Sequence, residues 1–224
     1  MGSDNGASDE QPVHTVHLDA FYVDKYEVTN ALYKACADAG VCQLPKDTSS
    51  KARSNYYGNP EFDDYPVIYV DWNMAKIYCE TWRGAHLPTE AEWEKAARGT
   101  DGRTYPWGED SGGEGSECSK ANYYEDCATD TTKVGSYESG KSIYGAYDMA
   151  GNVLEWVADW YSETYYQTSP SANPLGPDSG QYRVLRGGSF STKNDVNLRS
   201  AARSSSPPSV SLWNIGFRCA RSIP

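Results

Sequence analysis

Near its C-terminus the chain reads Arg186-Gly187-Gly188-Ser189-Phe190, then Leu198-Arg199-Ser200-Ala201-Ala202-Arg203, then Asn214-Ile215-Gly216-Phe217-Arg218-Cys219. We call the first of these motifs the first bracket and the last the second bracket. Both combine glycine, arginine and aromatic residues, which restrict where a backbone can lie. The polar segments 191–197 and 204–213, which we call the filling segments, contain neither cysteine nor histidine. The pattern predicts a rigid frame that carries a polar surface.

The composition favours one aromatic-rich domain. At 224 residues the chain is long enough to bury a core, and we expect a single domain over residues 1–224. Seven Trp and eighteen Tyr are present, and each ring can remove roughly 150 to 250 Å² from water. Aromatic side chains are therefore expected to form much of the core.

The charge excludes one class of partner. With 31 acidic and 20 basic residues, the net charge of -11 repels phosphate backbones, so we expect no nucleic-acid partner. No stretch approaches the roughly 18 consecutive apolar residues of a membrane-spanning helix. We therefore expect no membrane span.

Six cysteines are present, and two pairs are close in sequence: Cys36 with Cys42, and Cys118 with Cys127. Short polar loops between such pairs favour disulfides over zinc sites, and no Cys-x2-Cys motif occurs. We expect an oxidised, exported protein that is extracellular, periplasmic or at the cell surface. The printed chain shows no signal peptide, so this expectation requires one to have been removed.

Local signals predict three helices and several short strands. Thr29 is a candidate N-cap for a helix over 30–39, a second helix is expected over 71–82, and Pro88-Thr89 precedes the third. Alternation predicts a strand pair within 13–28 that turns near Asp19. Further short strands are expected over 153–160, 183–188 and 216–221. The sequence between residues 98 and 144 lacks periodicity, so it needs disulfides or cations to hold it.

Eight motifs along the chain occur in the order seen in one known family. They are Met1-Gly2-Ser3, Tyr26-Glu27-Val28-Thr29-Asn30, Tyr65-Pro66-Val67 with Val70-Asp71-Trp72, Leu87-Pro88-Thr89-Glu90-Ala91-Glu92-Trp93-Glu94, Tyr105-Pro106-Trp107-Gly108, Tyr147-Asp148-Met149-Ala150-Gly151-Asn152-Val153-Leu154-Glu155-Trp156, Arg186-Gly187-Gly188-Ser189 and Gly216-Phe217-Arg218-Cys219. Together they resemble the formylglycine-generating enzyme (sulfatase-modifying factor) family, whose fold is related to C-type lectins.

The resemblance implies an irregular α+β fold of the C-type-lectin-like, formylglycine-generating-enzyme kind, with little regular secondary structure. It also implies a disulfide between Cys79 and Cys219. The second structural disulfide of the family maps approximately to Ala97 and Ser200, so that bond is absent here. In relatives the Met-Gly-Ser motif usually lies inside a longer chain, which agrees with a removed export signal.

Active members of the family bind Cu(I) through two cysteines that follow the Gly-Gly-Ser motif. The first maps to Thr192, and the second falls between Asp195 and Asn197. Hydroxyl and amide oxygens are poor ligands for Cu(I), so we expect no copper and no formylglycine-generating activity. The chain is predicted to be a pseudoenzyme without catalytic residues.

Other catalytic centres have no support in the sequence. A related branch of the family holds iron with histidines, but His14 and His17 are three apart in an expected strand and face opposite sides. His86 is alone before the third helix, and we expect all three to be structural or surface residues. No Gly-x-Ser-x-Gly motif surrounds Ser189.

Calcium is the expected structural cofactor. Asp148 and Glu155 flank a tight Gly151-Asn152 segment, and calcium accepts six to eight oxygens in flexible geometry. By resemblance, one site consists of Asp148, Ala150, Gly151, Val153 and Glu155, the middle three through backbone oxygens. The alternative is a turn satisfied by its own hydrogen bonds.

A second calcium site would begin at Asn122 and Tyr123. Asp126 and Asp130 compete for the charged position. The nearby Cys127 leaves open that a disulfide replaces this site.

The filling segments are predicted to bind a protein, peptide or other ligand. Ser and Asn give adaptable hydrogen bonding and Trp gives a rigid anchor, as in antibody paratopes. The predicted contact residues are Ser191, Thr192, Lys193, Asn194, Asp195, Asn197, Ser204, Ser206, Ser209, Ser211 and Trp213.

Relatives of this fold include variable proteins of diversity-generating retroelements, in which codons of this same region are rewritten. The resemblance therefore favours a non-catalytic binding module. Three alternatives stay open: a plain solvent-exposed loop, an oxidoreductase-like enzyme with altered chemistry, and one module of a larger protein. The sequence does not identify the ligand or the oligomeric state.

Overall fold

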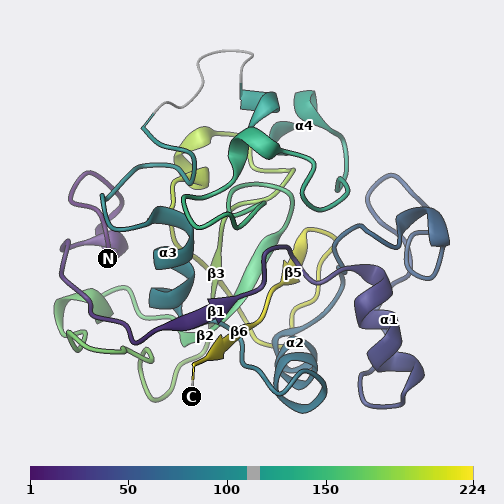
Figure 1. Ribbon diagram of the computed structural model, residues 1–224, viewed down its shortest axis with the longest axis horizontal. Coiled ribbons are helices and arrows are strands. Elements are labelled where there is room, and N and C mark those ends of the chain that lie inside the picture. Colours follow the sequence, from purple (N-terminus) through teal and green to yellow (C-terminus); the bar gives the residue numbers. More distant parts are fainter. Residues whose placement is uncertain (110–116, 224) are drawn as a thin grey trace.

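The fold is α+β, with short elements joined by long irregular segments (Figure 1). A computed structural model describes residues 1–109 and 117–223. The helices are α1 (Asn30–Asp38), α2 (Trp72–Ile77), α3 (Glu90–Arg98) and α4 (Tyr124–Cys127). The strands are β1 (Phe21–Val23), β2 (Leu154–Trp160), β3 (Arg183–Arg186), β4 (Ser204–Ser206), β5 (Ile215–Phe217) and β6 (Ala220–Ser222). The predicted fold class is confirmed.

Side-chain caps explain where the longer helices begin. Thr29 Oγ1 accepts from the Leu32 N–H at 3.4 Å at the start of α1. At α3, Thr89 Oγ1 accepts from the Glu92 N–H at 3.1 Å, and the Glu92 carboxylate accepts from the Thr89 N–H at 2.8 Å. Each bond satisfies a donor that the helix itself leaves unpaired. Both predicted starts are confirmed.

The second predicted helix changes geometry along its length. Asp71 is its N-cap and not its first residue, since the carboxylate accepts from the Met74 N–H at 2.9 Å. The α-helix ends at Ile77 and continues as a π-helical segment, Tyr78–Trp82. Cys79, which was expected on this helix, lies in the π-helical segment.

A four-stranded sheet with the order β4-β3-β2-β5 lies in the middle of the molecule (Figure 1). The β2–β3 and β3–β4 pairs are antiparallel, whereas β2 and β5 are parallel. Strand β3 leads into the first bracket, and β5 belongs to the second. The two brackets are therefore held by strands on either side of β2.

The predicted strand pair within residues 13–28 is wrong. Strand β1 pairs with β6 instead, with Phe21 opposite Ser222, and His17 forms only an isolated bridge to Ala172. Alternation indicates which residues are extended, but it does not specify the partner strand. Here the partner lies at the other end of the chain.

Aromatic rings fill much of the core, as the composition predicted. Tyr33 stacks on Tyr78 with ring centroids 5.6 Å apart, and Phe217 meets Tyr78 edge-on at 5.4 Å. Trp93 and Trp156 are fully buried. Such contacts connect α1, the π-helical segment, α3 and the central sheet.

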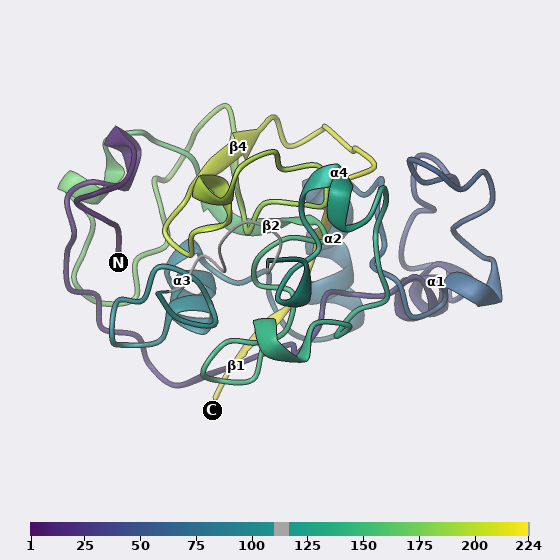
Figure 2. The same cartoon turned by 90° about the horizontal axis from the view of Figure 1, so that it is seen from above.

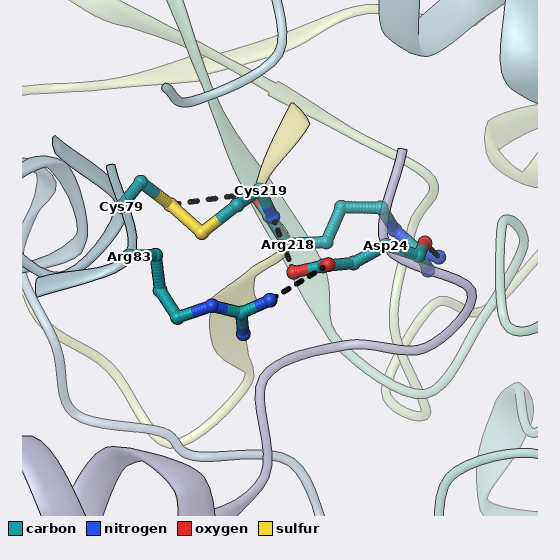
Figure 3. The surroundings of a disulfide bond; sticks show 5 residues. All are labelled: Asp24, Cys79, Arg83, Arg218 and Cys219. Atoms are coloured by element: carbon teal, nitrogen blue, oxygen red, sulfur yellow. Dashed lines mark hydrogen bonds and ion pairs between the residues drawn. A yellow bond between two sulfur atoms is a disulfide. The ribbon is translucent and has the colours of Figure 1, made fainter. Parts of the chain in front are cut away.

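All three predicted disulfides are present: Cys36–Cys42, Cys79–Cys219 and Cys118–Cys127. The Cys79–Cys219 bond joins residues 140 apart and ties the π-helical segment to the second bracket. Beside it, Asp24 accepts from the Cys219 N–H at 3.2 Å and pairs with Arg83 at 3.5 Å (Figure 3). Within the described residues, no helix is long and apolar enough to cross a membrane.

Candidate functional site

Arg186 of the first bracket is completely buried. Its Nη1 donates to the carbonyl oxygens of Ala201 at 2.9 Å and Ala202 at 2.5 Å. Its Nη2 donates to Glu94 Oε2 at 2.7 Å and to the Ser200 carbonyl at 2.9 Å. One guanidinium group therefore fixes the backbone that separates the two filling segments.

Arg203 closes the same network from the start of the second filling segment. Its Nε and Nη2 donate to the two carboxylate oxygens of Glu90, at 2.8 and 2.9 Å. Burial alone would raise the pKa of Glu90, but the charges of Arg203 and Arg186 outweigh it, and the pKa is lowered. Glu90 is thus a buried anion that anchors both arginines.

The second bracket is held by a separate buried ion pair. Arg218 Nη2 and Nε donate to Glu155 Oε1 at 2.6 Å and Oε2 at 2.8 Å, and Trp93 Nε1 donates to the same Oε2 at 2.8 Å. Arg218 also donates to the carbonyl oxygens of Tyr147 at 2.8 Å and Asp24 at 3.1 Å. The second bracket is therefore locked to β2 and to the loop before it.

Two glycines give the first bracket its sharp turn. Gly187 and Gly188 have φ values of +92° and +70°, which only glycine adopts freely. A Cβ atom on Gly188 would lie 2.9 Å from Leu198 Cδ2 and 3.1 Å from the Asn197 carbonyl oxygen. The turn is closed by the Ser189 N–H, which donates to Thr192 Oγ1 at 2.9 Å.

The filling segments reach the surface along their whole length. Figure 2 shows β4 and the chain after it on one side, opposite β1 and the C-terminus. Of the predicted contact residues, the exposed ones are Lys193, Asn194, Asn197, Ser204 and Ser209. The half-buried ones are Ser191, Thr192, Asp195, Ser206, Ser211 and Trp213. All eleven are accessible to a partner.

A cavity of about 170 Å³ lies beneath the first bracket. Its lining includes Thr192, to which the first copper-binding cysteine maps, and Asn197, at one end of the range 195–197 in which the second falls. The remaining lining residues are Leu154, Leu185, Gly187, Gly188, Ala202, Arg203 and Ser204. The donors in this cavity are hydroxyl, amide and guanidinium groups. Such groups bind ligands by hydrogen bonds and suit a soft metal ion poorly.

An aromatic platform lies next to the filling segments. Trp213 packs on Phe190 with ring centroids 5.1 Å apart. Lys51 Nζ lies 5.4 Å from the Trp213 centroid and 5.9 Å from the Phe190 centroid. Sequence reasoning missed Lys51, because nothing in its local sequence connects it with residues so far along the chain.

The Cys118–Cys127 loop also borders the candidate surface. The Tyr124 N–H donates to the Thr192 carbonyl oxygen at 3.1 Å, and the Tyr124 side chain is exposed. The disulfide loop therefore extends the surface beyond the two filling segments. This extension was also absent from the sequence prediction.

The first predicted calcium set is only partly open to a cation. Asp148 Oδ2 accepts from the Gly135 N–H at 2.7 Å, and burial raises the pKa of Asp148 to about 6. Glu155 is committed to the second bracket, as described above. A calcium ion at this loop would therefore depend on Asp148 and on the backbone oxygens of Ala150, Gly151 and Val153.

Glu27 is a third carboxylate beside this loop that the sequence prediction omitted. It accepts from Asn152 Nδ2 at 2.6 Å and from the Val153 N–H at 3.2 Å. Burial, together with the charges of Asp148 and Glu155, raises the pKa of Glu27 well above its usual value. One buried arginine, Arg218, thus faces three buried carboxyl groups.

At the second predicted calcium set, Asn122 Oδ1 is buried and has no hydrogen-bond partner among the described residues, which fits an oxygen ligand. Tyr123 is buried beside it. Asp130 is already engaged, since its Oδ2 accepts from Ser50 Oγ at 2.5 Å and from the Ala52 N–H at 2.9 Å. The side chain of Asp126 lies outside the described residues. No group of three or more His, Cys, Asp or Glu that could hold a metal occurs among those described.

The three histidines have separate surroundings. His14 meets Tyr166 edge-on with ring centroids 5.0 Å apart, and the His17 side chain is exposed. His86 Nε2 lies 3.1 Å from Glu92 Oε2, and this hydrogen bond raises the pKa of His86. Each histidine therefore has its own local environment.

Comparison with known proteins identifies the family. Residues 1–223 match the family model described as Sulfatase-modifying factor enzyme 1-like domain. The chain belongs to this family. It is 37% identical to a formylglycine-generating enzyme of Streptomyces coelicolor, over 98% of this chain and 84% of that protein. The predicted family and its C-type-lectin-like fold are thus confirmed.

Two other relatives have different descriptions. A serine/threonine-protein kinase Pkn1 of Chlamydia trachomatis is 41% identical over 99% of this chain, which spans 36% of the length of that kinase. Among solved structures, Treponema denticola variable protein 1 superposes with a TM-score of 0.81 at 26% identity, over 99% of this chain and 91% of that one. Members of one fold thus carry names from several functional classes.

Proposed function

We propose that this domain is a non-catalytic binding module that recognises a protein, peptide or other ligand through the filling segments. The observation that carries the proposal is the cavity beneath the first bracket. Thr192, to which the first thiol of the oxidase maps, lines it together with Asn197, which ends the range 195–197 for the second. Oxygen and nitrogen donors there favour recognition over copper chemistry.

The arrangement of the surface supports the same role. Arg186 fixes the backbone between the two filling segments and Arg203 is anchored on buried Glu90, while the side chains of the filling segments are exposed or half-buried. Trp213 supplies a rigid aromatic anchor of the kind enriched at binding hot spots. A preorganised backbone reduces the ordering cost of binding.

The likeness to Treponema denticola variable protein 1 supports a finer proposal. We infer that the filling segments can change in sequence while the brackets stay fixed, as in a variable protein of a diversity-generating retroelement. A neighbouring reverse transcriptase gene and a near-identical template repeat would support this inference. Their absence from the genome would contradict it.

Binding is tested by screening the domain against immobilised peptide and glycan libraries. A variant carrying Asn194→Ala, Ser209→Ala and Trp213→Ala should lose the hits while remaining folded. Tyr22→Ala serves as the matched control, since Tyr22 is 65% exposed on β1 and outside the surface. Hits that survive the triple variant would contradict the proposal.

The alternative is an enzyme that has kept the cavity but changed its chemistry. The cavity of about 170 Å³ and the 37% identity to a formylglycine-generating enzyme favour it. Incubation with copper, oxygen and a Cys-x-Pro-x-Arg peptide distinguishes the two functions. We expect no aldehyde, and turnover that Thr192→Ala reduces would establish the enzyme.

Calcium and cell location complete the proposal. Addition of calcium should raise the unfolding temperature, and Asp148→Ala should abolish the rise, with Glu61→Ala as a surface control. No effect of calcium on the unfolding temperature would contradict the structural site.

Three disulfides support an exported location, since such bonds persist in oxidising compartments.

A further inference from the structure

A second cavity, of about 570 Å³, shares no lining residue with the cavity beneath the first bracket. It lies where β1 begins and β6 ends, next to α2 and the start of α3 (Figure 1). Figure 2 places β1 and the C-terminus on the side away from β4. The volume falls in the range of about 300 to 1,000 Å³ that small-molecule sites occupy.

Arg183 is the most constrained charged group in this lining. Its Cζ lies 3.7 Å from the ring centroid of Trp72 and 3.5 Å from that of Trp160. Nη1 donates to the Ala158 carbonyl oxygen at 2.6 Å, whereas Nε is buried and has no hydrogen-bond partner among residues 1–109 and 117–223. Stacking on both faces restricts any further partner to the edge of the guanidinium group.

The other charged lining residues pair among themselves or with nearby groups. Lys76 lies 3.8 Å from Glu80, and His86 lies 3.1 Å from Glu92. Asp19, on the exposed rim, lies 4.0 Å from His17.

Within the part of the chain that the structure describes, Arg183 has no carboxylate within ion-pair distance. Burial lowers the pKa of Arg183 to about 10, although the charge of Asp159 opposes this effect. Arg183 therefore remains a cation at neutral pH. A partly desolvated cation without a counter-ion is costly, and a bound anion removes that cost.

The walls around this cation are largely apolar. Phe21, Trp72 and Leu87 contribute to the lining, and Leu175 and Ile223 are 73% and 44% exposed at its rim. An anion with an apolar body would cover these rings and side chains as it binds. The acidic residues at the rim oppose ligands that carry several negative charges.

We propose that this cavity binds a small organic monocarboxylate, with the carboxylate group on Arg183 and the apolar part against Trp72, Leu87 and Leu175. The proposal is independent of the filling segments, because the two sites share no residue. It assigns a separate ligand-binding role to a face of the domain that the binding-module proposal leaves unused.

The first test needs no variant. A panel of aliphatic and aromatic monocarboxylates, including 4-phenylbutyrate, is titrated into the full chain at pH 7.5 beside the matching amides. We expect at least one acid to bind on the order of tenfold tighter than its amide, as for a charge-assisted pair. A panel in which no acid is preferred over its amide would overturn the proposal.

Substitutions then assign the preference to Arg183. Arg183→Gln should abolish the preference for the acid, Arg183→Lys should keep part of it, and Trp213→Ala should leave it unchanged. An Arg183→Gln protein that folds and still prefers the acid would refute the assignment.

Glu80→Gln gives a second readout that does not depend on the folding of Arg183→Gln. The negative charge of Glu80 at the rim repels a bound carboxylate. Removing it should tighten binding of the acid about two- to threefold at low salt and leave the affinity for the amide unchanged. An unchanged affinity for the acid would count against the site.

Discussion

The brackets and the filling segments alternate along the same stretch of chain but differ in burial. Arg186 and Arg218 are completely buried, and each makes ion pairs and carbonyl contacts with distant segments. Asn194 and Ser209 are exposed between them. The contrast shows that buried guanidinium groups hold the brackets, whereas the side chains of the filling segments are exposed or half-buried.

This separation has a physical basis. A buried ion pair tolerates little change, because removing one partner leaves an uncompensated charge in a medium of low dielectric constant. Substitution of an exposed serine or asparagine replaces one solvated side chain by another and therefore changes the free energy of unfolding little. Substitutions should therefore divide sharply between the two regions, and the following predictions test that division.

The largest effect is expected from the disulfide that ends the second bracket. Replacing Cys79 and Cys219 by alanine opens a loop of 140 residues, which costs about 5 kcal/mol in the chain-entropy model. The matched control, the Cys36 and Cys42 pair, spans only 6 residues and should cost about 2 kcal/mol. Chemical denaturation measures both, and equal losses would contradict the comparison.

Arg218→Met should have the next largest effect. It leaves Glu155 buried without its partner, and we expect a loss of about 3 to 5 kcal/mol in the free energy of unfolding. Lys193→Met removes the same charge from an exposed position in a filling segment and should change stability by less than about 0.5 kcal/mol. If Arg218→Met with Glu155→Leu is no more stable than Arg218→Met alone, the stranded-charge explanation is wrong.

Asp148 should give the protein a pH dependence of intermediate size. Its folded-state pKa of about 6 lies above the unfolded value, so the folded state binds more protons between about pH 4 and pH 6. The free energy of unfolding should therefore fall by about 2 to 3 kcal/mol as the pH rises through this window. Asp148→Asn should remove this part of the pH dependence. Chemical denaturation of the wild type and of the variant over this pH range, without calcium, measures the difference. If the free energies of unfolding of the two proteins change with pH in parallel, Asp148 does not cause the dependence.

The smallest effect is expected within the filling segments themselves. Asn194→Ala and Ser209→Ala should each change the free energy of unfolding by less than about 0.5 kcal/mol. Gly188→Ala, in the adjacent bracket, should cost clearly more because its φ is +70° and a Cβ would meet Leu198. Thermal unfolding measures all three, and similar losses would show that the bracket is not special.

Local sequence was sufficient for features that depend on neighbouring residues. The caps at Thr29 and Thr89 were predictable because each side chain bonds to a backbone N–H three residues along. The short disulfides were predictable because their cysteines are six and nine positions apart in the sequence. The Cys79–Cys219 bond was expected only through the family resemblance.

Features that depend on distant residues were missed. The pairing of β1 with β6 was assigned wrongly, and Glu27 was not connected with Asp148. Lys51 beside Trp213 had no local signal either. In each case the chain supplies a residue of ordinary type, and only packing determines what that residue contacts.

The sequence by itself determined the two short cysteine pairs and the absence of cysteine from residues 191–197; through the resemblance of its motifs it also determined the family, the irregular α+β fold and the Cys79–Cys219 bond. These follow from residue identity and short-range order, which chemistry restricts directly. The tertiary structure alone decided that Glu155 serves Arg218, that Arg186 fixes residues 200–202, and that Arg183 lies between two tryptophans beside a cavity. Contacts of this kind form between segments far apart in the chain, so their energies depend on the whole packed fold and leave no local pattern.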